Sequence, residues 1–378
     1  MYQIAPMSED QEAIKAAVEK TLEPFDDEYW GTVDETGNWP EEFCDAMAKG
    51  GWLGIAFPEE YGGAGLGLTE AALMMQTVTR TGAGFSGASA IHLNIFGPKP
   101  LEKFGNSELK QESLPKIISG EEKMCFAVTE PNSGLDTSSL ETRAERTNNG
   151  YVINGRKIWT TGAQRADKIL IIARTTPKDQ CAKPHLGLSL FYTDLNRNRI
   201  EANPIPKMGR KAVECNTLFI DNLEVPKEHL IGEEGAGFKY LLQGLNPERV
   251  LFAVESVGLG FAALERAARY ANERVVFGRP IGQNQGIQHP LAKSWAELSA
   301  AELLAYKAAG LYDKGEECGA EANASKYLGT EAGFRACETA VLTHGGMGYA
   351  KEYHVERMMR EAMLARIAPV SREMILNF

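Results

Sequence analysis

The chain has 378 residues, of which 43% are hydrophobic and 24% charged, a composition typical of a soluble protein with two or three domains. A net charge of −11 argues against nucleic acid as a partner, no apolar run reaches the roughly 20 residues of a membrane helix, and the N-terminus resembles no targeting signal. We therefore expect a cytoplasmic protein with neither nucleic acid nor membrane as partner, and the spacing of the cysteines and histidines predicts neither a disulfide frame nor a metal site.

Residues 1–121 are predicted to form an N-terminal α-helical domain. Ser8 is expected to cap its first helix, because a serine side chain can accept a hydrogen bond from an unpaired N–H of the first turn. Pro40 suits the first turn of a later helix. The glycine-rich stretch Pro58–Gly67 is expected to turn the chain into a further helix, Thr69–Thr81.

Residues 122–232 are predicted to form a middle β domain. Its strand-like runs are Cys125–Thr129, Tyr151–Ile153, Lys157–Trp159, Lys168–Ala173, Gly187–Tyr192, Arg199–Ala202 and Thr217–Ile220. Asn154-Gly155, between two of these runs, is a strong signal for a hairpin turn. Because no helical run separates the strands, we expect antiparallel pairing in a barrel-like sheet.

Residues 233–378 are predicted to form a C-terminal helical bundle. The first helix carries an apolar stripe, and three more follow at Pro290–Leu311, Ala322–Thr343 and Val355–Ile367. Gly258–Ala263 matches the glycine pattern of a dinucleotide-binding turn, but it follows no strand and lies inside a helical pattern. Close helix packing is therefore the better interpretation of these glycines.

Four sequence blocks are more specific than these patterns. They are Phe126–Asp136, Asn154–Ala163, Arg274–Ile281 with Gln285, and Gly345–Tyr349 with the helix that contains Arg357 and Arg360. Together, in this order and spacing, they resemble the signatures of the acyl-CoA dehydrogenase family and span nearly the whole chain.

The resemblance implies a mainly α fold with an N-terminal helical domain, a central antiparallel β domain and a C-terminal four-helix bundle. It also implies FAD in a cleft between subunits of a homotetramer, a dimer of dimers. The implied reaction is α,β-dehydrogenation of an acyl-CoA to the trans-2-enoyl-CoA, with electrons passed to an electron-transfer flavoprotein. Since CoA is polyanionic and the chain is acidic, binding needs local cations or backbone donors.

The resemblance also implies a set of cofactor-binding residues. On the β domain they are Phe126, Val128, Thr129, Gly134, Leu135, Trp159, Thr160 and Thr161, and near the C-terminus Ser371. Residues expected to reach a neighbouring subunit's FAD, or to let backbone approach it, are Arg274, Phe277, Gln285, Gly345 and Gly346. A flavin needs a flat apolar wall and donors at its edges, which these residue types can supply. Without the blocks, Trp159 would be interpreted as a core or interface aromatic and Arg274 as a solvated helix residue.

The catalytic base is expected on an early turn of the bundle. Most family members carry it late in the chain, but here Ile367–Ser371 contains no carboxylate, and Pro369 stands where the glutamate would be. Isovaleryl-CoA and long-chain dehydrogenases instead place a glutamate before an arginine on an earlier helix. By that resemblance Glu248 is the base, and Asn246, Arg249 and Leu135 contact the substrate.

Two alternatives remain for these residues. A glutamate in the first turn of a helix is also favoured by the helix dipole alone. Glu255 is a rival carboxylate, seven residues and about 10 Å further along the same helical face, and could instead be a buried or interface group.

Two departures from the family pattern bear on the chemistry. Leu135 replaces a serine, and Pro369 lacks a backbone N–H whose loss commonly costs on the order of 3 kcal/mol of transition-state stabilisation. Either Val370 N–H or an FAD hydroxyl compensates, or the chemistry differs. The alternative functions are oxidase or monooxygenase chemistry on the same fold, or a non-catalytic acyl-CoA-binding relative. The chain also ends at Phe378, earlier than is usual, so a short C-terminal segment is expected to be missing.

Overall fold

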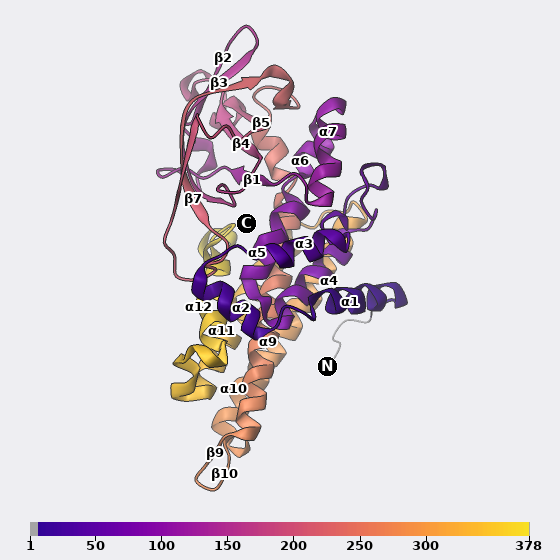
Figure 1. Cartoon of the computed structure of the whole chain (residues 1–378), viewed down its shortest axis with the longest axis vertical. Coiled ribbons are helices and arrows are strands. Elements are labelled where there is room, and N and C mark those ends of the chain that lie inside the picture. Colours follow the sequence, from indigo (N-terminus) through magenta and orange to yellow (C-terminus); the bar gives the residue numbers. More distant parts are fainter. Residues whose placement is uncertain (1–6, 378) are drawn as a thin grey trace.

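The computed structural model describes residues 7–377. The first four residues, on which the expected absence of a targeting signal rests, and Phe378 at the chain end lie outside the described residues. Helices come first in the chain, strands second and helices again last, and the sheet forms one end of an elongated molecule (Figure 1). The predicted three-part fold is therefore confirmed.

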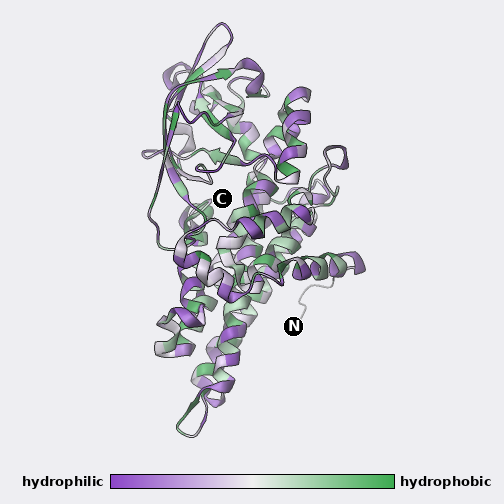
Figure 2. Cartoon of the chain, in the orientation of Figure 1, coloured by the Kyte–Doolittle hydropathy of each residue, from purple (hydrophilic) through white to green (hydrophobic). Residues whose placement is uncertain are grey.

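In the part of the chain that the structure describes, seven α-helices precede the sheet. They are α1 (Glu9–Leu22), α2 (Asp27–Thr36), α3 (Glu41–Lys49), α4 (Leu68–Val78), α5 (Gly84–Phe96), α6 (Lys99–Phe104) and α7 (Ser107–Ser119). Ser8 caps α1 as predicted, with its hydroxyl oxygen 3.2 Å from Gln11 N. Pro40 precedes α3 at the cap position rather than lying in its first turn. Hydrophilic residues are frequent on α1, which projects from the side of the molecule and buries only Val18 and Leu22 (Figure 2).

The sheet is largely antiparallel, as predicted, with one parallel strand. Its strands are β1 (Met124–Ala127), β2 (Arg143–Arg146), β3 (Gly150–Thr161), β4 (Lys168–Arg174), β5 (Leu188–Asp194), β6 (Ile200–Pro204), β7 (Cys215–Pro226) and β8 (Leu230–Ile231). The order is β6-β7-β3-β2-β4-β5-β8, and β1 pairs with β4 in parallel, while β2 meets β4 in parallel at a single pair. The parallel pairing of β1 was not foreseen; it leaves the C-terminal end of β1 beside β3.

The hairpin predicted at Asn154-Gly155 is wrong. β3 runs straight through these residues, and the chain turns earlier, at Thr147–Gly150, where Thr147 N donates to Gly150 O over 2.8 Å. At Gly155 the pairing with β7 shifts register, and the Asn154 side chain accepts a hydrogen bond from Asn222 N. The Asn-Gly pair thus marks a β-bulge, since glycine and asparagine suit both kinds of site.

The C-terminal region is built around one long helix. Its elements are α8 (Gly237–Leu242), α9 (Leu245–Glu273), the short strands β9 (Val275–Val276) and β10 (Arg279–Pro280), α10 (Gln285–Asp313), α11 (Gly319–His344), α12 (Val355–Ile367) and α13 (Arg372–Ile375). α9 is buried on nearly all sides through its middle rather than along one stripe. It packs against α4, α5, α10, α11 and α12 and therefore joins the two helical regions.

The glycines of α9 serve helix packing, as the sequence analysis indicated. A Cβ at Gly258 would lie 2.1 Å from Thr79 Oγ1 and 2.5 Å from Gln76 O, so α4 approaches too closely for any side chain. A Cβ at Gly260 would lie 2.6 Å from Leu298 Cδ2 of α10. Within residues 7–377, no helix combines the length and the apolar character needed to cross a membrane.

Candidate active site

The first two sequence blocks meet at the end of β1. Ile158 N donates to Thr129 O over 2.9 Å, and Lys157 Nζ donates to Val128 O over 2.9 Å. The end of β1, the segment that follows it and the second half of β3 therefore lie together. This region carries six of the predicted cofactor-binding residues: Phe126, Val128, Thr129, Trp159, Thr160 and Thr161.

A buried ion pair holds this region in place. Lys157 is fully buried, and its Nζ lies 2.8 Å from Glu130 Oε1, while Glu130 also accepts from Glu141 N at 2.6 Å and Thr142 N at 3.0 Å. Burial opposes the charged form of Glu130, but Lys157 and these hydrogen bonds outweigh it and lower the pKa of Glu130 overall. Burial lowers the pKa of Lys157 to about 8. Both groups are satisfied, so the pair is structural.

The region is shaped to receive a ligand. Trp159 is 53% exposed and has φ of 63°, a left-handed conformation rare for a bulky residue, at a register shift in β3. The Thr160 hydroxyl is buried without a hydrogen-bond partner among the described residues. Leu135 is 51% exposed, and Gly134 has open space around it. An uncovered aromatic, local strain and an unpaired hydroxyl fit the flat ring of a flavin.

The predicted base lies in the first turn of α9. Glu248 is partly buried, and among residues 7–377 no hydrogen bond or ion pair engages its carboxylate. Burial raises the pKa of Glu248 from 4.5 to about 7, although the positive charges of His92 and Arg249 oppose the shift. A carboxylate with a pKa near neutrality is suited to accept a proton from carbon at physiological pH.

Asn246 and Arg249 share this turn with Glu248. Arg249 Nη1 donates to Asn246 Oδ1 over 3.2 Å, and Arg249 Nε is buried without a partner among the described residues. Burial lowers the pKa of Arg249, and the charge of Glu248 opposes that shift. The structure therefore brings together the three residues predicted for catalysis and substrate contact, whereas Leu135 lies on the β-domain turn.

The rival carboxylate, Glu255, has a partner of its own. Its Oε1 lies 2.6 Å from Nδ1 of His92 on α5, and the two side chains are 1% and 7% exposed. Burial alone would lower the pKa of His92, but the charge and hydrogen bond of Glu255 raise it overall. Glu255 is therefore the buried carboxylate foreseen as an alternative, and it is bound to a histidine that sequence reasoning did not single out.

The C-terminal segment approaches the same region through a buried lysine. Lys326 of α11 donates from Nζ to Val370 O over 2.5 Å, and its charge acts on both Glu248 and Arg249. Burial lowers the pKa of Lys326 to about 8. Ser371 accepts a hydrogen bond from Met374 N and caps α13, so its hydroxyl already has a structural role. Pro369 precedes Val370 and Ser371 and has no backbone N–H to donate.

The remaining predicted residues lie at the opposite end of α9. Arg274 follows α9 directly, 26 residues or about 39 Å beyond Glu248, and Phe277 at the β9–β10 tip is fully exposed (Figure 1). Gln285 begins α10. Gly345 follows His344, whose ring stacks on Tyr270 of α9 at 4.3 Å, and Gly346 comes next; this places the glycine turn at the same end. One chain thus holds two separate groups of predicted residues.

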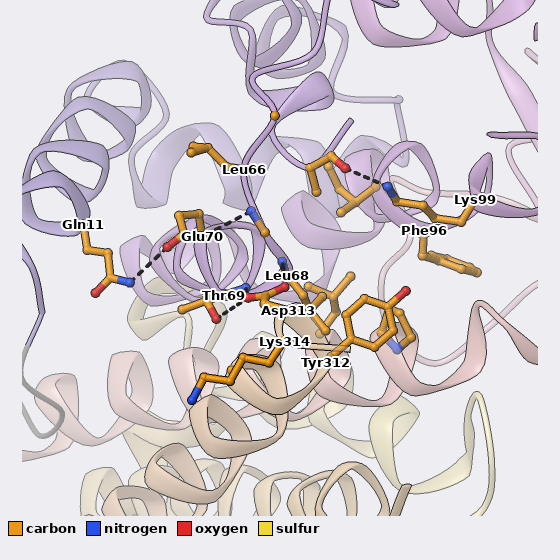
Figure 3. Close-up of a pocket in the computed structure, with 17 residues that line it drawn as sticks. Gln11, Leu66, Leu68, Thr69, Glu70, Phe96, Lys99, Tyr312, Asp313 and Lys314 are labelled. Atoms are coloured by element: carbon orange, nitrogen blue, oxygen red, sulfur yellow. Dashed lines mark hydrogen bonds between the residues drawn. The ribbon is translucent and has the colours of Figure 1, made fainter. Parts of the chain in front are cut away.

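A hollow lies beside the base-bearing turn. It has a volume of about 690 Å³ and runs between the start of α4, the end of α5 and the end of α10, with Pro247 and Leu251 of α9 in its wall (Figure 3). Asp313 crosses it to cap α4, since its carboxylate accepts from Leu68 N at 2.6 Å and Thr69 N at 2.9 Å. Phe96 lines the hollow.

Sequence reasoning missed His92, Lys326 and the Glu130–Lys157 pair. His92 is a lone polar residue in the run Ile91-His92-Leu93, and one such residue is an ambiguous signal. Glu130 lies in the first sequence block and Lys157 in the second. A search for oppositely charged residues in these two blocks could have found the pair.

Comparisons with known proteins identify the family of the chain. Models of the N-terminal, middle and C-terminal domains of acyl-CoA dehydrogenase match residues 8–121, 125–223 and 235–377. The acyl-CoA dehydrogenase fadE12 of Mycobacterium bovis is 36% identical over 98% of this chain and 95% of its own. The caffeyl-CoA reductase-Etf complex subunit CarC of Acetobacterium woodii is 34% identical, covering 89% and 87%.

Two solved structures extend the comparison. Butyryl-CoA dehydrogenase from Megasphaera elsdenii superposes with a TM-score of 0.93 at 28% identity, covering 99% of this chain and 97% of that one. The FAD complex of PigA gives a TM-score of 0.92 at 25% identity, covering 99% and 97%. The chain therefore belongs to the acyl-CoA dehydrogenase family of FAD-dependent oxidoreductases.

Proposed function

We propose that the protein oxidises the Cα–Cβ bond of an acyl-CoA thioester to the trans-2-enoyl-CoA, with Glu248 as the base. The observation that carries this proposal is the state of Glu248: a partly buried carboxylate without a partner among the described residues, whose pKa is raised to about 7. In the same fold, the other buried carboxylates described above are bound to Lys157 or His92. FAD, when bound, would supply the acceptor for the hydride that leaves Cβ.

The chain's own residues have distinct tasks in this reaction. Glu248 takes the proton from Cα, and desolvation increases its affinity for that proton. Arg249 and Asn246 lie beside it and are proposed to contact the thioester and CoA. The surface of Trp159 and Thr129 is proposed to hold the flavin ring, with the Thr160 hydroxyl as a donor that lacks a partner in the described chain.

We further propose that a second copy completes each FAD site in a homotetramer. The supporting observation is the distance of about 39 Å along α9 between Glu248 and Arg274, which separates the two groups of predicted residues. Exposed apolar side chains mark the distal end, with Phe277, Leu342 and Tyr349 at 101%, 73% and 89% exposure. Replacing Phe277 with serine should lower both FAD content and assembly, measured by flavin absorbance and sedimentation.

The proposed electron acceptor is an electron-transfer flavoprotein. The support is the relative CarC, whose name places it in a complex with such a partner. Mixing the reduced protein with an electron-transfer flavoprotein should reoxidise its flavin faster than oxygen does. Rapid reoxidation by oxygen alone would instead favour oxidase or monooxygenase chemistry.

An anaerobic titration of the flavoprotein with straight, branched and cyclic acyl-CoAs tests the reaction itself. Bleaching of the flavin band by one class is the expected result, and it would also identify the acyl group. If a protein with intact flavin were bleached by none of them, the dehydrogenase proposal would be wrong and the non-catalytic alternative favoured.

A further inference from the structure

The ion pair of His92 with Glu255 involves only one of the two nitrogens of the imidazole ring. Nδ1 is bound to Glu255 at 2.6 Å, whereas Nε2 is buried and has no hydrogen-bond partner within residues 7–377. Because the Glu255 carboxylate accepts, Nδ1 carries a proton, and Nε2 is a donor when the ring is protonated, the form that the raised pKa of His92 favours. A buried donor without a partner among the described residues calls for one from outside the chain.

The aromatic neighbours of His92 connect it to the proposed site. The His92 ring lies 4.8 Å from that of Phe96 and 5.1 Å from that of Phe252. Phe252 follows Glu248 by one turn of α9, and Glu255 follows by two, so base, aromatic ring and carboxylate share one face. Phe96 in turn contacts Phe126 of β1 at 5.8 Å. The histidine is therefore linked through aromatic rings to the base-bearing helix and to the proposed flavin surface.

The charges around His92 favour a neutral partner over an anion. Glu255 and Glu248 both act on His92 with negative charge, and Arg210 is the positive group that acts on it. A carboxylate on the substrate would meet two acidic side chains in a buried setting, which is unfavourable. A keto or hydroxyl oxygen can accept the Nε2–H hydrogen bond without adding charge.

We propose that His92 is a specificity-determining residue whose Nε2–H binds a neutral oxygen on the acyl chain beyond Cβ, so that the preferred substrates are oxygenated acyl-CoAs. This inference rests on the proposed dehydrogenase function and names its substrate class. Glu255 positions the ring, and the aromatic side chains exclude water from the hydrogen bond.

The test is binding of two shape-matched analogues to the FAD-loaded protein by titration calorimetry. In 3-thia-5-oxohexanoyl-CoA and 3-thia-5-methylhexanoyl-CoA, sulfur replaces Cβ, so neither can be oxidised, and they differ by an oxygen in place of a methyl group. The oxo analogue should bind about tenfold more tightly, as one net hydrogen bond predicts. Equal affinities, a preference for the methyl analogue, or no binding of either would overturn the proposal.

Variants separate recognition from structure. His92→Phe should remove the oxo preference and change the affinity for the methyl analogue less than threefold, whereas His92→Gln, which keeps an N–H donor, should retain part of it. His229→Phe, a histidine bonded to Thr193 in the β domain, should leave the ratio unchanged. An equal loss with both analogues in His92→Phe would assign His92 a structural role. If His92→Phe fails to fold, the affinity ratio of the parent protein still decides the proposal.

Failure of this inference differs from failure of the proposed function. If acyl-CoAs bleach the flavin but the analogues bind equally, the His92 proposal is wrong and the dehydrogenase stands. If no acyl-CoA bleaches the flavin, the proposed reaction is wrong, whatever the affinity ratio of the analogues.

Discussion

Glu130 is a buried and Glu248 a partly buried carboxylate of one chain, and their surroundings shift their pKa values in opposite directions. Glu130 has a lysine and two backbone N–H donors, and its pKa is lowered. Glu248 has no bonded partner in the described chain, and its pKa is raised to about 7. The cation and hydrogen-bond donors around Glu130 stabilise its charged form. The desolvation of Glu248 favours its protonated form, so Glu248 is ready to bind a proton. Desolvation without a hydrogen-bond or ion-pair partner in the described chain therefore distinguishes the candidate reactive carboxylate from the structural one.

The largest expected effect comes from removing the proton acceptor. Glu248→Gln should lower kcat by on the order of 10²–10⁴-fold, because a general base commonly contributes that much. The parent's rate should rise with pH through about 7, where Glu248 loses its proton. Single-turnover flavin reduction measures both.

Glu255→Gln is the comparison that can contradict this assignment. It should lower the rate less than Glu248→Gln does, since Glu255 is bound to His92. A larger loss in Glu255→Gln, with normal flavin content in both variants, would transfer the role of base to Glu255.

The next effect concerns the satisfied carboxylate. Lys157→Met leaves Glu130 buried without its cation, which should lower the free energy of unfolding by about 3–5 kcal/mol. Chemical denaturation measures the loss. Adding Glu130→Gln should restore much of it, because the neutral amide no longer needs a positive partner. If Lys157→Met were as stable as the parent, the Lys157–Glu130 ion pair would not stabilise this segment of the β domain.

A third prediction follows from the raised pKa of Glu248. Between pH 4.5, its ordinary pKa, and about 7, the folded protein binds more protons than the unfolded chain, so the contribution of Glu248 to stability falls as pH rises. Above that window, the full penalty is at most about 3 kcal/mol. Glu248→Gln should therefore be more stable than the parent at pH 8 and about equal at pH 4, as measured by urea unfolding. A less stable variant at pH 8 would show that Glu248 is satisfied.

The smallest expected effect concerns Gly155, which packs against the segment that donates a hydrogen bond to Glu130. A Cβ at Gly155 would lie 2.5 Å from Oγ1 and 2.7 Å from Cα of Thr142, whose N–H donates to Glu130. Gly155→Ala should cost about 1–3 kcal/mol through overpacking and lower FAD affinity with it. Thermal unfolding and flavin retention measure both. Unchanged values would mean that the strand can shift away from Thr142.

Much of the fold could be predicted from the sequence, because its helices follow strong periodic patterns. The end helix Val355–Ile367 agrees with its prediction at both ends. The Asn-Gly pair led to the wrong prediction of a hairpin at Gly155, because β-bulges and hairpin turns favour the same residue types. The parallel pairing of β1 depends on contacts with a strand more than 40 residues away, which no local pattern encodes.

The candidate site could be predicted from the sequence only in part. Glu248 and Arg249 were found through their motif, but the motif does not tell which carboxylate is left without a partner. That distinction depends on His92, 163 residues before Glu255, and on the burial of each group. The roles of the cofactor-binding residues stay predictions until FAD is bound.

The cap that Asp313 provides for α4 has a consequence for how the chain is made. Its partners Leu68 and Thr69 lie 245 and 244 residues earlier, so α4 has no such cap until almost the whole polypeptide has left the ribosome. At usual translation speeds this delay is roughly 12–50 seconds. For most of this interval the emerging N-terminal helices also lack α9, against which α4 packs. We expect nascent chains that end before α9 to be sensitive to protease and to bind chaperones, and protection that first appears once residue 313 has emerged would show that the helical regions complete each other's folding.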